Sequence, residues 1–117
     1  SSDWIFFDTK TAEYDKKTKI LTGWFTWFRT PYGREKTIES AKRGGYYDPY
    51  RHDNHSYTKK KDRWSLNSNK RMILNYTDYS TEGSVLYQPT IENPKWDEIV
   101  PDSIGEEMFE NLIKRYR

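Results

Sequence analysis

The segment from Ile20 to Phe28 restricts the fold most strongly, because large apolar side chains occupy both of its alternating sets of positions. One set holds Ile20, Trp24 and Phe28, and the other holds Leu21, Phe25 and Trp27. Successive side chains of a strand point to opposite faces of a sheet, so neither face of this strand suits water. The pattern predicts a central strand, or a strand that keeps one face for a partner. Pro31 and Gly33 are expected to end it.

Aromatic rings must supply much of the hydrophobic core. The 117-residue chain has 5 Trp, 10 Tyr and 5 Phe, against 8 Ile, 5 Leu and 2 Val, and it has no cysteine. This length fits one domain over residues 1–117, and the ring content argues against disorder. The lack of cysteine excludes disulfides, thiolate metal sites and thiol nucleophiles. No apolar run reaches the roughly 18 residues of a membrane-spanning helix.

Further strands are predicted on both sides of a long irregular middle. Their expected ranges are residues 4–7, 63–67, 71–79 and 84–87. The second and third are expected to form a hairpin, with Met72, Leu74 and Tyr76 on one face. Residues 33–62 show no sustained period, although residues 35–43 have the composition of a short helix or strand.

The strongest local signal lies at the end of the chain. Ser103 and Glu106 have the spacing of a capping box, with Asp102 as a competing cap. The residues that follow form one apolar stripe at helical spacing: Ile104, Met108, Phe109, Leu112, Ile113 and Tyr116. Strands first and one helix last predict an α+β domain, in which an antiparallel β-sheet has a C-terminal α-helix packed on one face.

Positive charge is concentrated in the middle of the chain. Residues 29–71 hold 12 basic and 5 acidic residues, whereas the remainder holds 8 basic and 13 acidic. Tyrosine and arginine are favoured at protein interfaces, so we predict a partner-binding surface in this basic, tyrosine-rich segment, with a solvated loop as the alternative. The candidate residues are Tyr46, Tyr47, Tyr50, Arg51, Tyr57, Lys59, Lys60, Lys61 and Arg63.

The same segment fits two polyanions. Its rings could stack on bases while its cations meet phosphates, but the net charge of only +2 and the lack of a nucleic-acid motif argue against a dedicated nucleic-acid binder. A sulfated glycan fits a surface protein better.

No catalytic, cofactor or metal site is predicted. His52 and His55, with Asp48 and Asp53 nearby, are the main candidate metal ligands, but their spacing matches no helix-borne zinc motif. We interpret both histidines as solvated loop residues. The serines lack a nucleophile-elbow context, and two histidines offer few acid or base groups for catalysis near neutral pH. We therefore expect a protein that is not an enzyme.

Several motifs of the C-terminal half form a recognisable series. They are Trp64-Ser65-Leu66-Asn67, Lys70 to Leu74, Tyr79 with Gly83-Ser84-Val85, and Trp96 to Glu106, which reads W-x-x-I-x-P-x-S-x-G-E. The series resembles the surface-adhesin protein E-like family, in which a tryptophan precedes a proline and a small-residue cap that opens the last helix. Phe6-Phe7-Asp8 and the segment from Ile20 to Trp27 are similar in outline to the N-terminal strands of that family.

The resemblance implies an exported bacterial protein that pairs as a homodimer through its sheet and adheres to host matrix or serum proteins such as vitronectin or laminin. Members commonly carry one cysteine near the position of Asn67 and another at the end of the last helix, and this chain has neither. Packing of Trp64, Trp96 and Phe109 is then expected to hold the helix on the sheet instead.

These observations predict a non-enzymatic, extracytoplasmic binding or adhesion module, located in the periplasm or at the cell surface. Its partner is expected to be a protein or a sulfated glycan. The first residues, Ser1-Ser2-Asp3, show no signal or anchor pattern, so we expect that segment to be missing from the chain. The alternative is a cytosolic nucleic-acid-associated or regulatory domain that uses the same basic patch.

Overall fold

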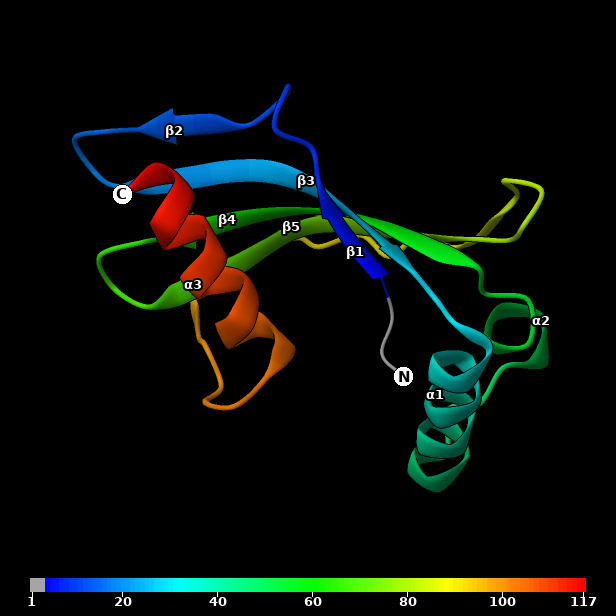
Figure 1. Cartoon of the computed structure of the whole chain (residues 1–117). Helices are drawn as coiled ribbons and strands as arrows, with labels where there is room; N and C mark the ends of the chain where they lie inside the picture. Colours follow the sequence, from blue (N-terminus) through cyan, green and yellow to red (C-terminus); the bar gives the residue numbers. More distant parts are fainter. Residues whose placement is uncertain (1–3) are drawn as a thin grey trace.

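The computed structural model describes residues 4–117 and contains one mixed α+β unit (Figure 1). Its elements are β1 (Trp4–Phe7), β2 (Glu13–Asp15), β3 (Ile20–Phe28), α1 (Pro31–Gly44), α2 (Pro49–His52), β4 (Tyr57–Ser65), β5 (Lys70–Tyr79), β6 (Val85–Tyr87), β7 (Asp97–Glu98) and α3 (Ile104–Tyr116). The strands pair antiparallel in the order β1-β3-β4-β5-β6, with β2 beside β3 and β7 beside β5. The predicted fold class is confirmed.

Helix α3 lies across one end of the sheet, whereas α1 and α2 lie beyond its other end (Figure 1). We call the face that α3 covers the inner face and the opposite one the outer face. The buried core gathers under α3, and its members are Leu21, Phe25, Trp64, Leu66, Phe109 and Leu112. The rings of Trp64 and Phe109 stack with their centroids 6.3 Å apart, as expected. Trp96 does not join them, because it is exposed directly before β7 and lines a hollow with Thr22 and Arg63 of the outer face.

Helix α3 begins where the capping box predicted. The backbone N–H of Glu106 donates to Oγ of Ser103 at 3.2 Å, so Ser103 is the cap. Asp102 is excluded as the cap because it adopts a left-handed conformation with φ of 59° one residue earlier. Acidic residues in the first turn and basic residues in the last turn complement the helix dipole.

Helix α1 begins where we expected a turn, and it contains residues 35–43, for which a short helix was one of two expectations. Pro31 does end β3, but it also opens a helix of 14 residues. The backbone N–H of Gly33 donates to Oγ1 of Thr30 at 3.0 Å, which makes Thr30 the N-cap. Proline is favoured directly after the cap, because its fixed φ suits a helix and the missing N–H would have no helical partner.

Strand β4 is longer than predicted, since it begins at Tyr57 instead of Arg63. Thr58, Lys60 and Asp62 of β4 lie on the inner face, and they alternate with Lys59, Lys61 and Arg63 on the outer face. Because both faces carry polar side chains, the alternation of apolar and polar residues that is typical of a strand is absent. The cluster Lys59, Lys60 and Lys61 therefore lies in a central strand, and not in a solvated loop, which was the alternative interpretation of the basic segment. Strand β2 was also missed, because three residues carry too little pattern.

A bulge in β5 changes which side chains share a face. Lys61 pairs with Asn75 and Asp62 pairs with Ile73, so β5 carries one extra residue between them. Met72 consequently lies on the outer face opposite Arg63, and Tyr76 lies on the inner face opposite Lys60. The prediction that Met72 and Tyr76 share a face was wrong, because sequence alternation cannot show a bulge.

Candidate functional site

The predicted partner-binding residues fall in three places. Tyr46, Tyr47 and Tyr50 lie between α1 and α2 or in α2, where the Tyr47 hydroxyl donates to Asp53 at 2.5 Å. That hydrogen bond raises the pKa of Tyr47. Tyr57, Lys59, Lys61 and Arg63 lie on the outer face of β4, and Arg51 and Lys60 line a pocket of the inner face.

Aromatic rings form a row across four strands of the outer face. We call Trp4, Phe6, Phe28, Tyr57 and Tyr79 the aromatic row. Neighbouring ring centroids along it are 6.5 Å, 5.8 Å, 5.8 Å and 4.9 Å apart. The β1 end of the row is exposed. Four of these rings, all except Tyr57, were missed as site residues, although a face reserved for a partner was one of the two interpretations of the segment from Ile20 to Phe28.

Cations continue this surface along β4. Lys59, Lys61 and Arg63 project on the same face as the aromatic row, and the Lys61 ammonium lies 5.9 Å from the ring centroid of Trp24. A groove of about 370 Å³ runs beside Lys59. It is lined by Asp8, Trp24, Phe25, Thr26, Lys59, Asn75, Thr77, Tyr79 and Gln88. Rings and cations side by side can contact both the apolar and the acidic parts of a partner.

The inner face has a pocket of about 270 Å³ beyond the end of α3, which we call the polar pocket because eight of its eleven lining residues carry charged or polar side chains. Asp78 organises it, because its carboxylate accepts from Nε of Arg51 at 2.9 Å and from the Thr58 hydroxyl at 2.7 Å. Nε2 of His55 lies 2.6 Å from the same hydroxyl. Burial lowers the pKa of His55, and the opposing attraction of Asp78 is smaller.

The interpretation of His52 and His55 as solvated residues was wrong. Both are buried, and Nδ1 of His52 accepts the backbone N–H of Asp48 at 3.0 Å, which ties α2 to its own N-cap. No group of three or more His, Asp or Glu side chains suited to a metal ion occurs in residues 4–117.

Largely buried Lys60 and fully buried Asp62 form an ion pair on the inner face. Nζ of Lys60 lies 3.8 Å from Oδ2 of Asp62, beyond hydrogen-bond distance, and the Asp62 carboxylate is fully buried with no hydrogen-bond partner among the described residues. Burial lowers the pKa of Lys60 and raises that of Asp62. Each charge partly offsets the effect on the other.

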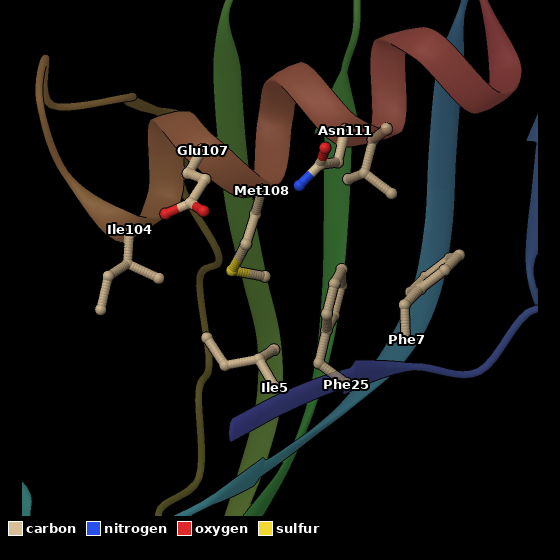
Figure 2. Close-up of a pocket in the computed structure, with 8 residues that line it drawn as sticks. Ile5, Phe7, Phe25, Ile104, Glu107, Met108 and Asn111 are labelled. Atoms are coloured by element: carbon tan, nitrogen blue, oxygen red, sulfur yellow. The ribbon is translucent and has the colours of Figure 1, made fainter. Parts of the chain in front are cut away.

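A third hollow, largely apolar, lies between α3 and β1 (Figure 2). Its volume is about 310 Å³, and Ile5, Phe7, Phe25, Ile104, Glu107, Met108, Asn111 and Leu112 line it. Figure 2 shows Met108 reaching from the helix toward Ile5 and Phe25, with Glu107 and Asn111 beside it on the helix. The first turn of α3 therefore packs less fully than the later turns, where Phe109 and Leu112 are buried.

No family model matches the chain, and no curated protein sequence matches it. Among solved structures, the chain is similar to the selenomethionine form of protein E from Haemophilus influenzae. The two are 10% identical, and the match covers 96% of this chain and 80% of that chain with a TM-score of 0.61. The shared fold is the one that the resemblance to the protein E-like family implied. In the part of the chain that the structure describes, no helix is long and apolar enough to span a membrane.

Proposed function

We propose that this protein is a non-enzymatic binding module of the cell surface or periplasm, and that it docks other proteins on the outer face of its sheet. The observation that carries the proposal is the aromatic row lying beside the cations of β4 on one face. Exposed rings at this density are typical of interaction surfaces, because a monomer gains nothing by leaving them in water. The protein E fold and the family resemblance support an adhesive role toward matrix or serum proteins.

A binding assay on immobilised vitronectin and laminin tests the basic part of the surface. The test variant is Lys59→Glu with Lys61→Glu, and the control is Lys16→Glu with Lys17→Glu in the exposed turn after β2. Like charges brought together at an interface cost several kcal/mol, so we expect at least about a tenfold loss in the test variant alone. Equal loss in both variants would show that net charge, and not this face, directs binding.

The rings are tested by a pair of residues with matched exposure. Phe6 in the aromatic row and Tyr32 on α1 are each 54% exposed. Phe6→Ser is expected to weaken binding at least about tenfold, as removal of an interface hot spot does, and Tyr32→Ser is expected to leave it within about twofold. Unchanged binding in Phe6→Ser would remove the row from the docking surface.

A homodimer, which the resemblance implies, would use the same row. Light scattering measures this directly: a dimer that Phe6→Ser converts to a monomer assigns the row to self-association and leaves the cations of β4 for the partner. A monomer at every concentration leaves the whole face to the partner.

Single-stranded nucleic acid is the second candidate partner, because rings flanked by cations on a sheet also suit stacked bases and phosphates. Tight binding of an oligothymidylate that falls steeply with salt would favour it. Protease treatment of intact source cells decides the location, since a cytosolic domain would stay protected.

A further inference from the structure

The polar pocket on the inner face contains a largely buried cation, Lys60, that makes no hydrogen bond to the described residues. The Lys60 side chain is 13% exposed, and within residues 4–117 its ammonium group makes no hydrogen bond. Its neighbours are Asp62 at 3.8 Å and the ring of Trp27, whose centroid is 5.5 Å away. Buried charges are normally paired and hydrogen-bonded, so an ammonium group in this state has capacity for another anion.

A second cation lines the same pocket in a fixed orientation. Arg51 uses Nε to bind Asp78, and its guanidinium carbon lies 3.7 Å above the ring centroid of Tyr87. Its two terminal nitrogens make no hydrogen bond to the described residues. A guanidinium held this way offers a planar pair of donors, which is the geometry that sulfate and carboxylate groups accept.

The remaining lining combines flat apolar surfaces with hydrogen-bonding groups. Trp27, Ile73 and Tyr76 supply the apolar part, and Thr37, His52 and Thr58 supply hydroxyl and imidazole groups. Arg29 also lines the pocket, with its guanidinium carbon 5.0 Å from the ring centroid of Trp27. The cations Arg51 and Lys60 thus line the pocket together with the carboxylate of Asp78, which Arg51 binds.

We propose that this pocket binds one sugar unit that carries a sulfate or carboxylate group, with Lys60 and Arg51 holding the acidic group and Trp27 and Tyr76 flanking the ring. The volume of about 270 Å³ is at the low end for small-molecule sites and suits a single ring better than an extended chain. Hydroxyl and imidazole groups around an aromatic surface match the hydroxyl-rich rim and apolar faces of a sugar. The site lies on the opposite face from the proposed docking surface, so each can fail without the other.

The wild-type protein allows a direct test by two-dimensional ¹H–¹⁵N NMR. The indole N–H of Trp27 reports on the pocket, and that of Trp24, on the outer face, is the internal control. The probes are glucose 6-sulfate, glucuronic acid, glucose, inorganic sulfate and triglutamate, each up to about 20 mM. We expect glucose 6-sulfate, glucuronic acid or both to shift the Trp27 signal saturably, and glucose to leave it unchanged.

Variants on adjacent residues separate the two faces. Lys60→Met removes the pocket cation, and Lys59→Met removes an equal charge from the outer face of the same strand. We expect Lys60→Met to weaken binding of the sugar acid at least about tenfold, the worth of a charged hydrogen bond, and Lys59→Met to change it less than about twofold. If Lys60→Met fails to fold because Asp62 is left unpaired, the double variant Lys60→Met with Asp62→Leu removes both charges. The same loss of sugar-acid binding is expected in that variant.

Four outcomes would overturn the proposal. They are no saturable Trp27 shift with either sugar acid, equal shifts at Trp24 and Trp27, equal affinity for inorganic sulfate and glucose 6-sulfate, or tighter binding of triglutamate than of either sugar acid. The third would reduce the site to a simple anion site, and the fourth would assign it to acidic peptides. A preference for one of the two sugar acids would show whether the natural ligand carries a sulfate or a carboxylate group, and either preference supports the proposal.

Discussion

Gly23 lies on the inner face of β3 beneath the ring of Phe7. A Cβ atom at this position would stand 2.5 Å from Cε1 and 2.8 Å from Cζ of that ring. The ring has little room to move, because it packs at 4.8 Å against Phe25 and at 6.1 Å against Tyr116. Overpacking of this kind costs about 1–3 kcal/mol, and the lower entropy of unfolded alanine returns about 0.4–1 kcal/mol. We expect Gly23→Ala to lower the free energy of unfolding by about 1–2 kcal/mol.

Urea unfolding followed by tryptophan fluorescence measures this loss, with Gly44→Ala as the control. A Cβ at Gly44 would meet the ring of Tyr46, which is 59% exposed and free to turn into solvent, so we expect a change between zero and a gain of about 1 kcal/mol. The cycle with Phe7→Leu decides the cause. If Gly23→Ala costs as much in the Phe7→Leu background as in the wild type, the ring is not the obstacle and the reasoning fails.

Three further predictions concern the helix and the polar pocket. Phe109→Ala should cost about 3–5 kcal/mol in the same urea assay, because the ring is buried against Trp64. Ser103→Ala should cost about 1 kcal/mol and reduce the helical circular dichroism signal, because Ser103 is the cap of α3. Burial lowers the pKa of His55, so the unfolded chain binds the proton more tightly than the folded one. The stability that comes from neutral His55 is therefore present above the ordinary histidine pKa of about 6.5, and it is lost as the pH falls through the lowered pKa. The urea concentration at the unfolding midpoint should therefore decrease when the pH is lowered from about 6.5 to about 5, and it should decrease less in His55→Gln.

The elements that the sequence predicted well are those whose signal is local and dense. The segment from Ile20 to Phe28 carries apolar groups at both parities, and Ser103 stands at capping distance from Glu106. Strand β4 gave no such signal, because Lys60 and Asp62 occupy positions where an inner face usually has apolar residues. Pro31 was interpreted as a breaker alone, although a proline after Thr30 is equally a helix start.

The candidate surfaces depend on pairing between distant segments, which alternation cannot supply. Phe28, Tyr57 and Tyr79 align because β3, β4 and β5 pair in one register. The polar pocket needs Arg51 to meet Asp78, 27 residues later in the chain, and it needs the bulge that turns Tyr76 inward. The sequence did indicate that the middle segment was basic and rich in tyrosine, but it could not assign Lys59 and Lys60 to opposite faces without knowing that they lie in a strand.

The buried pair of Lys60 and Asp62 offers a last test of whether the polar half of the inner face serves binding. A domain of this size has little stability to spare, and a buried ion pair without hydrogen bonds is often less stable than apolar residues of similar volume. We expect Lys60→Met with Asp62→Leu to raise the free energy of unfolding by about 1–4 kcal/mol while it abolishes binding of the sugar acids, and Lys60→Met alone to lower it by about 3–5 kcal/mol. Positions where a protein departs from the most stable choice are commonly functional sites. A double variant less stable than the wild type would show that the ion pair stabilises the fold. The inference that the protein keeps a destabilising pair for binding would then fail.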